Sequence, residues 1–207
     1  MERRELLKMI ALATGSVVIG GEFLLSGCKN NEAGKGITFS QEDIDFLNEV
    51  AETILPKTNT PGAKDAKVGD YMKVMVNDCY TEKDQKAFYA GIKQLDEACN
   101  KMHQTNFMKA SPEQRKALLI ELDKEAKAFQ KEKGEKEKAE KEKAGKERNK
   151  VFEFEPNHYF TMMKQLTLSG FFTSEVGAKQ ALRYVAVPGK FDGCIDYKKG
   201  DKAWATS

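Results

Sequence analysis

The residues able to carry acid–base or metal chemistry are few, and their spacing matches no common catalytic motif. The chain of 207 residues has two histidines, His103 and His158, and neither belongs to an HExxH or other paired-ligand arrangement. The sequence has no GxSxG nucleophile elbow, no GxGxxG turn and no phosphate-binding Walker loop. We therefore expect a chain that carries no catalytic residues, no metal and no cofactor of its own.

The N-terminal residues carry chemistry of another kind, that of protein export. Arg3 and Arg4 precede Leu7 and Lys8, and a short apolar run follows from residue 9 to residue 25. A positive region followed by an apolar region is typical of a signal peptide, and the Arg-Arg-x-x-Leu-Lys pattern resembles the twin-arginine export signal. The run has 17 residues and contains Glu22, so it is a poor membrane-spanning helix. The alternative is an ordinary basic helix start.

Residues 25–28, Leu-Ser-Gly-Cys, resemble a bacterial lipobox in which Cys28 is lipidated and becomes the new N-terminus. Each methylene of an attached acyl chain adds about 0.8 kcal/mol when it is buried in the membrane, so several chains anchor a protein stably. A buried structural cysteine is the alternative, but it leaves the preceding apolar run unexplained. We predict a twin-arginine lipoprotein signal over 1–27, a tether over 28–38, and a lipid-anchored protein on the periplasmic side of a bacterial membrane.

Three further cysteines, Cys79, Cys99 and Cys194, remain after that processing. None of them forms a CxxC or other metal-binding spacing. A disulfide is permitted outside the cytoplasm, and three thiols leave one unpaired. Three alternatives remain for these residues: a Cys79–Cys99 disulfide, a Cys99–Cys194 disulfide, or free thiols that are buried as small apolar side chains.

The body that positions any functional surface is predicted to be helical. Ser40 with Asp43, Thr81 with Asp84, and the segment beginning at Ser111 have the composition of helix N-caps. Apolar residues at helical spacing follow these starts and predict the buried faces. They are Ile44, Leu47, Val50 and Ile54; Val68, Met72, Met75 and Cys79; Phe88, Ile92, Leu95 and Met102; and Leu118, Leu119, Leu122 and Phe129.

A last apolar helix is expected from Tyr159 through Phe160, Met163, Leu166 and Leu168, ending near Gly170. Thr173 or Ser174 is positioned to cap a short helix that runs through Ala181. The final 25 residues contain Pro188, Gly189, Gly193 and Gly200 and predict an ordered, extended wrap. The fold class expected for residues 39–207 is therefore all-α, an irregular helical bundle with long connecting segments and an extended C-terminal wrap.

The charge balance excludes one class of partner. Lys and Arg number 34 and Asp and Glu number 32, so the net charge is only +2, and nucleic acid is not an expected partner. The segment 131–150 concentrates charge, with nine Lys or Arg and six Glu among 20 residues. We interpret the insertion at about 130–150 as a helical hairpin arm held by opposite charges four residues apart, with a disordered insertion as the alternative.

Two stretches are more specific than an anonymous helical bundle requires. Residues 52–63 read ETILPKTNTPGA and residues 170–178 read GFFTSEVGA. The second is followed by Tyr184, by Val-Pro-Gly at 187–189, by Asp-Gly-Cys at 192–194 and by Ala-Trp at 203–204. Together these motifs resemble the gluconate 2-dehydrogenase subunit 3 family, from about Phe39 to Trp204. The Lys/Glu insertion departs from that family's pattern.

The resemblance implies an accessory role in an oxidoreductase complex. In that family the partner is the large subunit, an FAD-dependent dehydrogenase of the GMC type that oxidises a sugar, a sugar acid or a related alcohol. A cytochrome c subunit or another carrier then takes the electrons. The small subunit has no catalytic residues; it supports maturation of the large subunit and supplies the export signal for the pair.

The same motifs supply candidate residues for the partner interface. They are Pro56, Thr60, Pro61, Gly62, Phe171, Phe172, Tyr184, Pro188, Gly189 and Trp204. Packing of the C-terminal wrap onto its own bundle is the alternative for the aromatic residues.

Two other functions stay open. The first is a free-standing lipoprotein that acts as a binding module. A large pocket with convergent polar groups, and no extended apolar surface, would favour it. The second is an enzyme that uses Tyr184, His158 or an acidic pair.

Overall fold

The computed structural model describes residues 37–144, 154–187, 189–190, 193–196 and 198–205. The chain divides into two units, residues 1–35 and 36–207, and the first lies outside the described residues. The described residues of the second unit form five α-helices and two short helical turns. They are α2 (Gln41–Ile54), α3 (Val68–Cys79), α4 (Glu82–His103), η2 (Phe107–Lys109), α5 (Pro112–Ala144), α6 (Tyr159–Thr173) and η3 (Gly177–Ala181).

The expected all-α class is confirmed for the described part of the chain. The sole β feature there is an isolated parallel bridge between Arg183 and Trp204. No described helix has both the length and the apolar composition needed to cross a membrane.

Local capping fixes the starts of three helices, as the sequence predicts. The Ser40 hydroxyl accepts a hydrogen bond from the Asp43 N–H, and the Asp43 carboxylate accepts one from the Ser40 N–H, which completes a capping box. Thr81 caps α4 through the bond that its hydroxyl accepts from the Asp84 N–H, and Ser111 and Gln114 form a second reciprocal pair at the start of α5. These bonds satisfy backbone donors that have no partner within the first turn of a helix.

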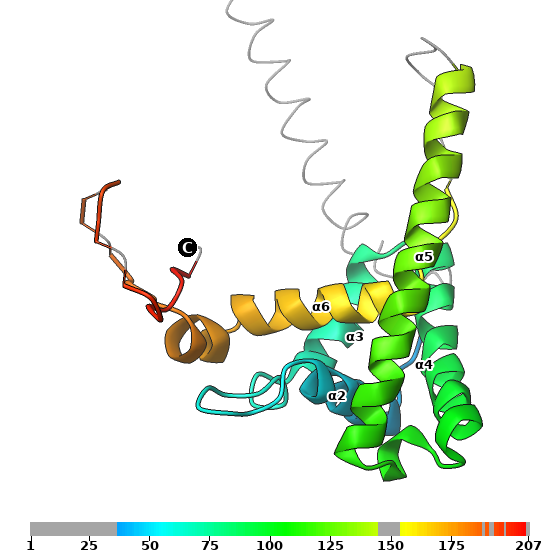
Figure 1. The fold of residues 1–207 in the computed structure, drawn as a ribbon, viewed down its shortest axis with the longest axis horizontal. Coiled ribbons are helices and arrows are strands. Elements are labelled where there is room, and N and C mark those ends of the chain that lie inside the picture. The colour runs from blue at the N-terminus through cyan, green and yellow to red at the C-terminus, as the bar shows by residue number, and fades with distance from the viewer. Residues whose placement is uncertain (1–36, 145–153, 188, 191–192, 197, 206–207) are drawn as a thin grey trace, which may run out of the picture. The chain divides into compact units, whose positions relative to one another are not determined.

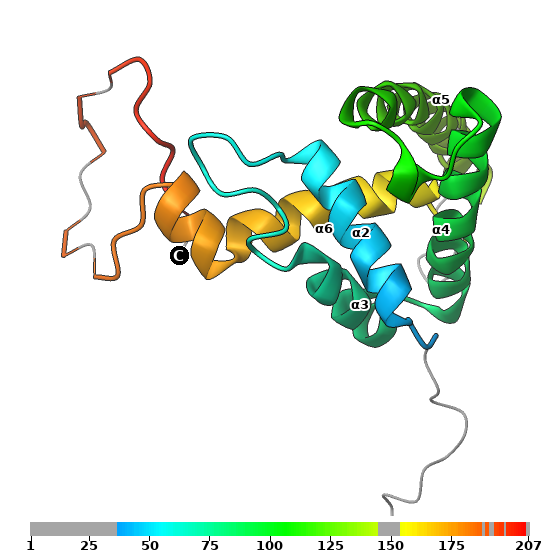
Figure 2. The ribbon, with the colours of Figure 1, turned by 90° about the horizontal axis from the view of Figure 1, so that it is seen from below.

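Helix α6 packs against α2, α3, α4 and α5 and lies among them in both ribbon views (Figure 1, Figure 2). Its buried residues lie on more than one face, as expected of a helix that is covered on several sides. They are Phe160, Met162, Met163, Leu166, Thr167, Gly170 and Phe171. Leu168 is an exception to the predicted core, because it is exposed.

The end of α6 differs from the prediction for a tertiary reason. The helix continues three residues beyond Gly170, to Thr173. A Cβ on Gly170 would lie 2.6 Å from Cδ1 of Tyr71, so the glycine permits close packing of α3 on α6 and is not a helix stop. The Tyr71 hydroxyl then lies 3.0 Å from the Ser169 hydroxyl, within hydrogen-bond distance.

The Lys/Glu segment is helical as far as the structure describes it, since α5 continues to Ala144. Figure 1 shows this half of α5 extending beyond the other described helices. Lys133 donates to the side-chain oxygen of Asn157 at 2.7 Å, and the Lys141 ammonium lies 4.9 Å from the ring centre of Phe154. Two lysines of this half of α5 therefore contact the segment that precedes α6. Residues 145–150 lie outside the described residues.

Neither the Cys79–Cys99 nor the Cys99–Cys194 disulfide is formed in the described part of the chain. Cys99 is buried in the core, whereas Cys79 and Cys194 are exposed. The predicted place of Cys79 on a buried helix face is therefore wrong, as is that of Met102, because both side chains lie on the solvent side of their helices.

Candidate functional site: a surface built from two sequence motifs

The loop between α2 and α3 is held by a single carboxylate. One oxygen of Glu52 accepts a hydrogen bond from the Lys57 N–H at 2.8 Å, and the other accepts one from the Lys64 N–H at 2.9 Å. Gly62 lies against this carboxylate, because a Cβ there would be 2.4 Å from both oxygens. The first motif therefore encodes a loop that is closed around Glu52, and the glycine at position 62 lets the backbone approach this carboxylate closely.

A second set of polar contacts fixes the outer part of this loop. Asp65 accepts from the Gly62 N–H at 3.1 Å and pairs with the Lys57 ammonium at 3.1 Å. The hydrogen bond from Lys57, followed by the one from Gly62, lowers the pKa of the Asp65 carboxyl. Asp65 is therefore charged at neutral pH and holds the loop from its solvent side.

The loop is also tied to α2 one turn earlier, through Glu49. This carboxylate pairs with Lys64 of the loop and with Arg115 of α5. Arg115 in turn donates to the carbonyls of Phe107 at 2.8 Å and Met108 at 2.7 Å. The ion pairs thus connect the loop with the turn between α4 and α5, and both Glu49 and Arg115 are largely shielded from solvent.

The second motif forms a compact turn after α6. The Ser174 hydroxyl donates to the Phe171 carbonyl at 2.6 Å and accepts from the Gly177 N–H at 2.9 Å. A Cβ on Gly177 would lie 1.9 Å from the Phe171 carbonyl oxygen, so the backbone closes here only with glycine. The turn continues as η3 and ends where Leu182 donates to the Gly177 carbonyl.

The two motifs meet, although about a hundred residues separate them in the sequence. A hollow of about 410 Å³ is lined by Lys57, Thr58, Asn59, Thr60, Pro61 and Asp65 of the first motif's loop and by Val176 and Gln180 of the second. Figure 2 shows the α2–α3 loop beside η3. We call residues 56–67 and 174–181 the motif surface.

The chain after η3 folds back on itself as a loop, residues 182–205, which we call the C-terminal loop. Its base is closed by two backbone hydrogen bonds of 2.8 Å, from the Arg183 N–H to Ala203 and from the Ala205 N–H to Arg183. The Arg183 guanidinium lies 4.7 Å from the ring centre of Trp204. Lys202 donates to the Gln180 carbonyl and so joins this base to the motif surface.

The described part of the C-terminal loop exposes apolar side chains and does not bury them on the bundle. Tyr184 is 43% exposed, Val187 81% and Trp204 51%. The predicted wrap is present as an extended segment, but self-packing on the helices does not account for these residues. Gly189 has a φ of +73°, a left-handed conformation that favours glycine.

The remaining predicted interface residues differ in their accessibility. Pro56 and Phe172 are exposed, Thr60 and Pro61 are half-buried, and Gly62 is buried against Glu52. Phe171 is 3% exposed and belongs to the core, because α6 turns it inward against the other helices. Pro188 lies outside the described residues, as do the export and lipidation residues Arg3, Arg4, Leu7, Lys8 and Cys28.

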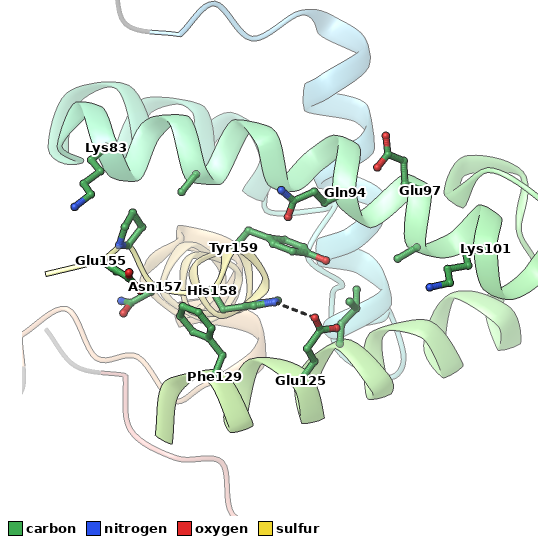
Figure 3. Close-up of a pocket in the computed structure, with 14 residues that line it drawn as sticks. Lys83, Gln94, Glu97, Lys101, Glu125, Phe129, Glu155, Asn157, His158 and Tyr159 are labelled. Atoms are coloured by element: carbon green, nitrogen blue, oxygen red, sulfur yellow. Dashed lines mark ion pairs between the residues drawn. The ribbon is translucent and has the colours of Figure 1, made fainter. Parts of the chain in front are cut away.

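A second hollow, of about 740 Å³, lies between α4 and α5 and was not predicted from the sequence (Figure 3). His158 and Tyr159 line it, with their rings 4.5 Å apart, and the His158 Nε2 lies 3.9 Å from the Glu125 carboxylate. The other lining residues are Lys83, Ala87, Gln94, Glu97, Ala98, Lys101, Leu122, Phe129, Glu155, Pro156 and Asn157. The sequence signal for this site is weak, since its residues come from three separate segments.

The polar side chains His158 and Tyr159 in this second hollow have the environment of structural residues. The His158 Nδ1 accepts from the Phe160 N–H at 3.3 Å and so caps α6. Burial lowers the pKa of His158, although Glu125 opposes the shift, and burial raises the pKa of Tyr159 to about 12. Both side chains are therefore neutral at pH 7. No cluster of three or more potential metal ligands occurs among the described residues.

Comparison with known proteins identifies the family. No curated protein and no solved structure matches the chain. A family model described as gluconate 2-dehydrogenase subunit 3 matches residues 41–189, which span the helical body, the motif surface and the start of the C-terminal loop. The chain belongs to the gluconate 2-dehydrogenase subunit 3 family.

Proposed function

We propose that this chain is the non-catalytic small subunit of a periplasm-facing, FAD-dependent dehydrogenase complex that oxidises a sugar or sugar acid. The large subunit, a flavoprotein of the GMC type, binds FAD and carries out the reaction. The small subunit supports maturation of that flavoprotein, carries it through the twin-arginine route and attaches it to the membrane. A cytochrome c subunit is a further partner that takes the electrons.

The observation that carries this proposal is that the two motifs lie together in the motif surface, next to the C-terminal loop with its exposed apolar side chains. Glu52 and Gly62 fix the first motif, and Ser174 and Gly177 fix the second, so the surface is preorganised. A surface that is ordered before binding loses less conformational entropy on association. Exposed aromatic residues such as Tyr184 and Trp204 are the kind that anchor protein interfaces.

The N-terminal sequence supports the export part of the proposal. The twin-arginine route carries folded cargo, and a flavoprotein acquires FAD in the cytoplasm. A partner that lacks a signal of its own can therefore travel bound to a chain that carries Arg3-Arg4, and Cys28 then supplies the membrane anchor.

The free-standing binding module is less well supported. The hollow between α4 and α5 brings polar groups together, as that function requires, but its histidine already caps a helix. Large apolar side chains also lie exposed on the surface of the C-terminal loop. A subunit role accounts for that surface, whereas a monomeric binding protein leaves it exposed to solvent.

Purification of the chain from its native membrane tests the proposal. The affinity tag is placed within the Lys/Glu segment, away from the motif surface and the C-terminal loop. We expect a flavin-containing polypeptide to co-elute in a fixed ratio with the tagged chain. A monomeric lipoprotein that elutes without flavin, from cells in which the flavoprotein is exported normally after this chain is deleted, would contradict the proposal.

A further inference from the structure

The C-terminal loop combines exposed apolar residues with an excess of positive charge. Tyr184, Val185, Val187, Ile195 and Trp204 are five of the twelve large hydrophobic residues that are exposed in the described part of the chain. The sequence of this loop also contains five cations, Arg183, Lys190, Lys198, Lys199 and Lys202, against the three carboxylates Asp192, Asp196 and Asp201. The chain as a whole is nearly neutral, at +2, so the charge is concentrated here.

The cations extend from the C-terminal loop onto the motif surface. The α2–α3 loop adds Lys57, Lys64 and Lys67, of which Lys57 pairs with Asp65 and Lys64 with Glu49. Lys202 donates to the Gln180 carbonyl, and Gln180 lines the same hollow as Lys57. The base of the C-terminal loop is therefore joined to the surface that the two motifs build, where Lys67 is a further exposed cation.

The base of the loop is preorganised. Arg183 stacks on Trp204, lies 3.9 Å from Asp201 and makes both backbone bonds of the bridge. Arg183 is therefore partly neutralised, whereas Lys190, Lys198 and Lys199 are exposed at positions away from the bridge. These three lysines are the ones best placed to meet a partner.

We propose that this loop docks on an acidic face of the flavoprotein subunit, with Trp204 and Tyr184 as apolar anchors and Lys190, Lys198 and Lys199 as the surrounding cations. The inference rests on the proposed function and adds the chemistry of the contact. Opposite charges around an apolar centre steer association and fix its orientation. The family model ends at residue 189, so most of this loop is beyond the part of the chain that defines the family.

A protein fits this loop better than a lipid surface does. The described loop is extended, and apart from its bridge its described residues have no helical or sheet pairing of their backbone N–H and C=O groups. A bilayer interior cannot satisfy those groups, whereas a protein partner can accept and donate hydrogen bonds to them.

The test compares two charge-reversed variants of the full-length chain. The first carries Lys190→Glu, Lys198→Glu and Lys199→Glu. The control carries Lys86→Glu, Lys101→Glu and Lys116→Glu, which are exposed lysines of α4 and α5 and make the same change in net charge. The probe is the flavoprotein that co-purifies with the wild-type chain, and its dissociation constant is measured at about 0.1 M and about 1 M NaCl, where the screening length falls from about 10 Å to about 3 Å.

We expect the loop variant to bind roughly ten- to a hundredfold more weakly than the wild type at the lower salt concentration, and the difference to shrink at the higher one. The control should bind as the wild type does. Equal binding by both variants would overturn the acidic-face inference and leave the proposed function intact. Failure of the wild-type chain to retain any flavoprotein would overturn both.

The lipid alternative is an outcome of a second measurement. Unlipidated Cys28→Ser chain is sedimented with phosphatidylglycerol-containing vesicles at the lower salt concentration. Binding that is lost in the loop variant and kept in the control would assign the loop to the membrane and overturn the inference. No sedimentation above that with neutral phosphatidylcholine vesicles is the result that we expect.

Discussion

The contact between Glu52 and Gly62 makes a prediction that can be worked from the structure. In Gly62→Ala, the new methyl group would lie 2.4 Å from both oxygens of Glu52, so the carboxylate has to move. Its movement breaks the hydrogen bonds from the Lys57 and Lys64 N–H groups. Glu52→Ala removes the same two bonds directly. Both substitutions therefore act through one feature, the closure of the loop around the carboxylate.

The expected magnitudes follow from the exposure of those donors. A hydrogen bond to a charged group contributes about 1.5–3 kcal/mol when its loss leaves a buried donor unpaired, but water can replace the acceptor at these exposed N–H groups. We therefore expect each single substitution to lower the free energy of unfolding by about 1–2 kcal/mol. Because both remove the same bonds, the double variant should lose about 1–2 kcal/mol as well, and not the sum of the two losses.

The assay is urea unfolding, followed by circular dichroism, of the unlipidated Cys28→Ser chain and its variants. Gly134→Ala is the control, because a Cβ on this helical glycine has no atom within 4 Å, and it should raise stability by about 0.5–1 kcal/mol. Additive losses in the double variant would refute the reasoning. So would a Gly62→Ala protein as stable as the parent.

Three further predictions concern the helix cap and the N-terminal signals. Burial lowers the pKa of His158, so the folded state prefers the neutral ring. The contribution of neutral His158 to the free energy of unfolding is present above the unfolded pKa of about 6.5 and is lost as the pH falls through the lower folded pKa. His158→Asn should therefore flatten the pH dependence of stability in unfolding curves measured between about pH 7 and pH 5. Replacing Arg3-Arg4 by Lys-Lys should hold both subunits in the cytoplasmic fraction, and export at the wild-type level would disprove the signal assignment. Cys28→Ser should release exported protein from the membrane, which cell fractionation detects, and unchanged membrane association would count against the anchor.

Local signals in the sequence predicted the helix boundaries that depend on neighbouring residues. Ser40 with Asp43 and Thr81 with Asp84 form their caps within one turn, so their composition is sufficient to place α2 and α4. Gly170 misled the prediction because its role depends on Tyr71, which lies about a hundred residues earlier in the chain. A contact between residues so far apart in the sequence, such as Gly170 and Tyr71, leaves no local pattern from which the role of the glycine can be predicted.

The candidate surface was predicted in part. Both motifs were recognised from their composition, but their meeting in one hollow depends on how α6 carries Val176 and Gln180 to the α2–α3 loop. Phe171 and Phe172 are adjacent in the sequence and equally apolar, yet one is buried in the core and the other is exposed. Only the direction in which the last turn of α6 faces separates them.

The account as a whole depends on whether this chain delivers a flavoprotein to the membrane. The most direct measurement is the fraction of FAD-containing dehydrogenase found in the membrane fraction, compared between cells that carry the chain and cells that lack it. We expect the flavoprotein to remain in the cytoplasm when the chain is absent and to return to the membrane when the wild-type chain is restored. Unchanged membrane localisation of the flavoprotein in cells without the chain would contradict the account.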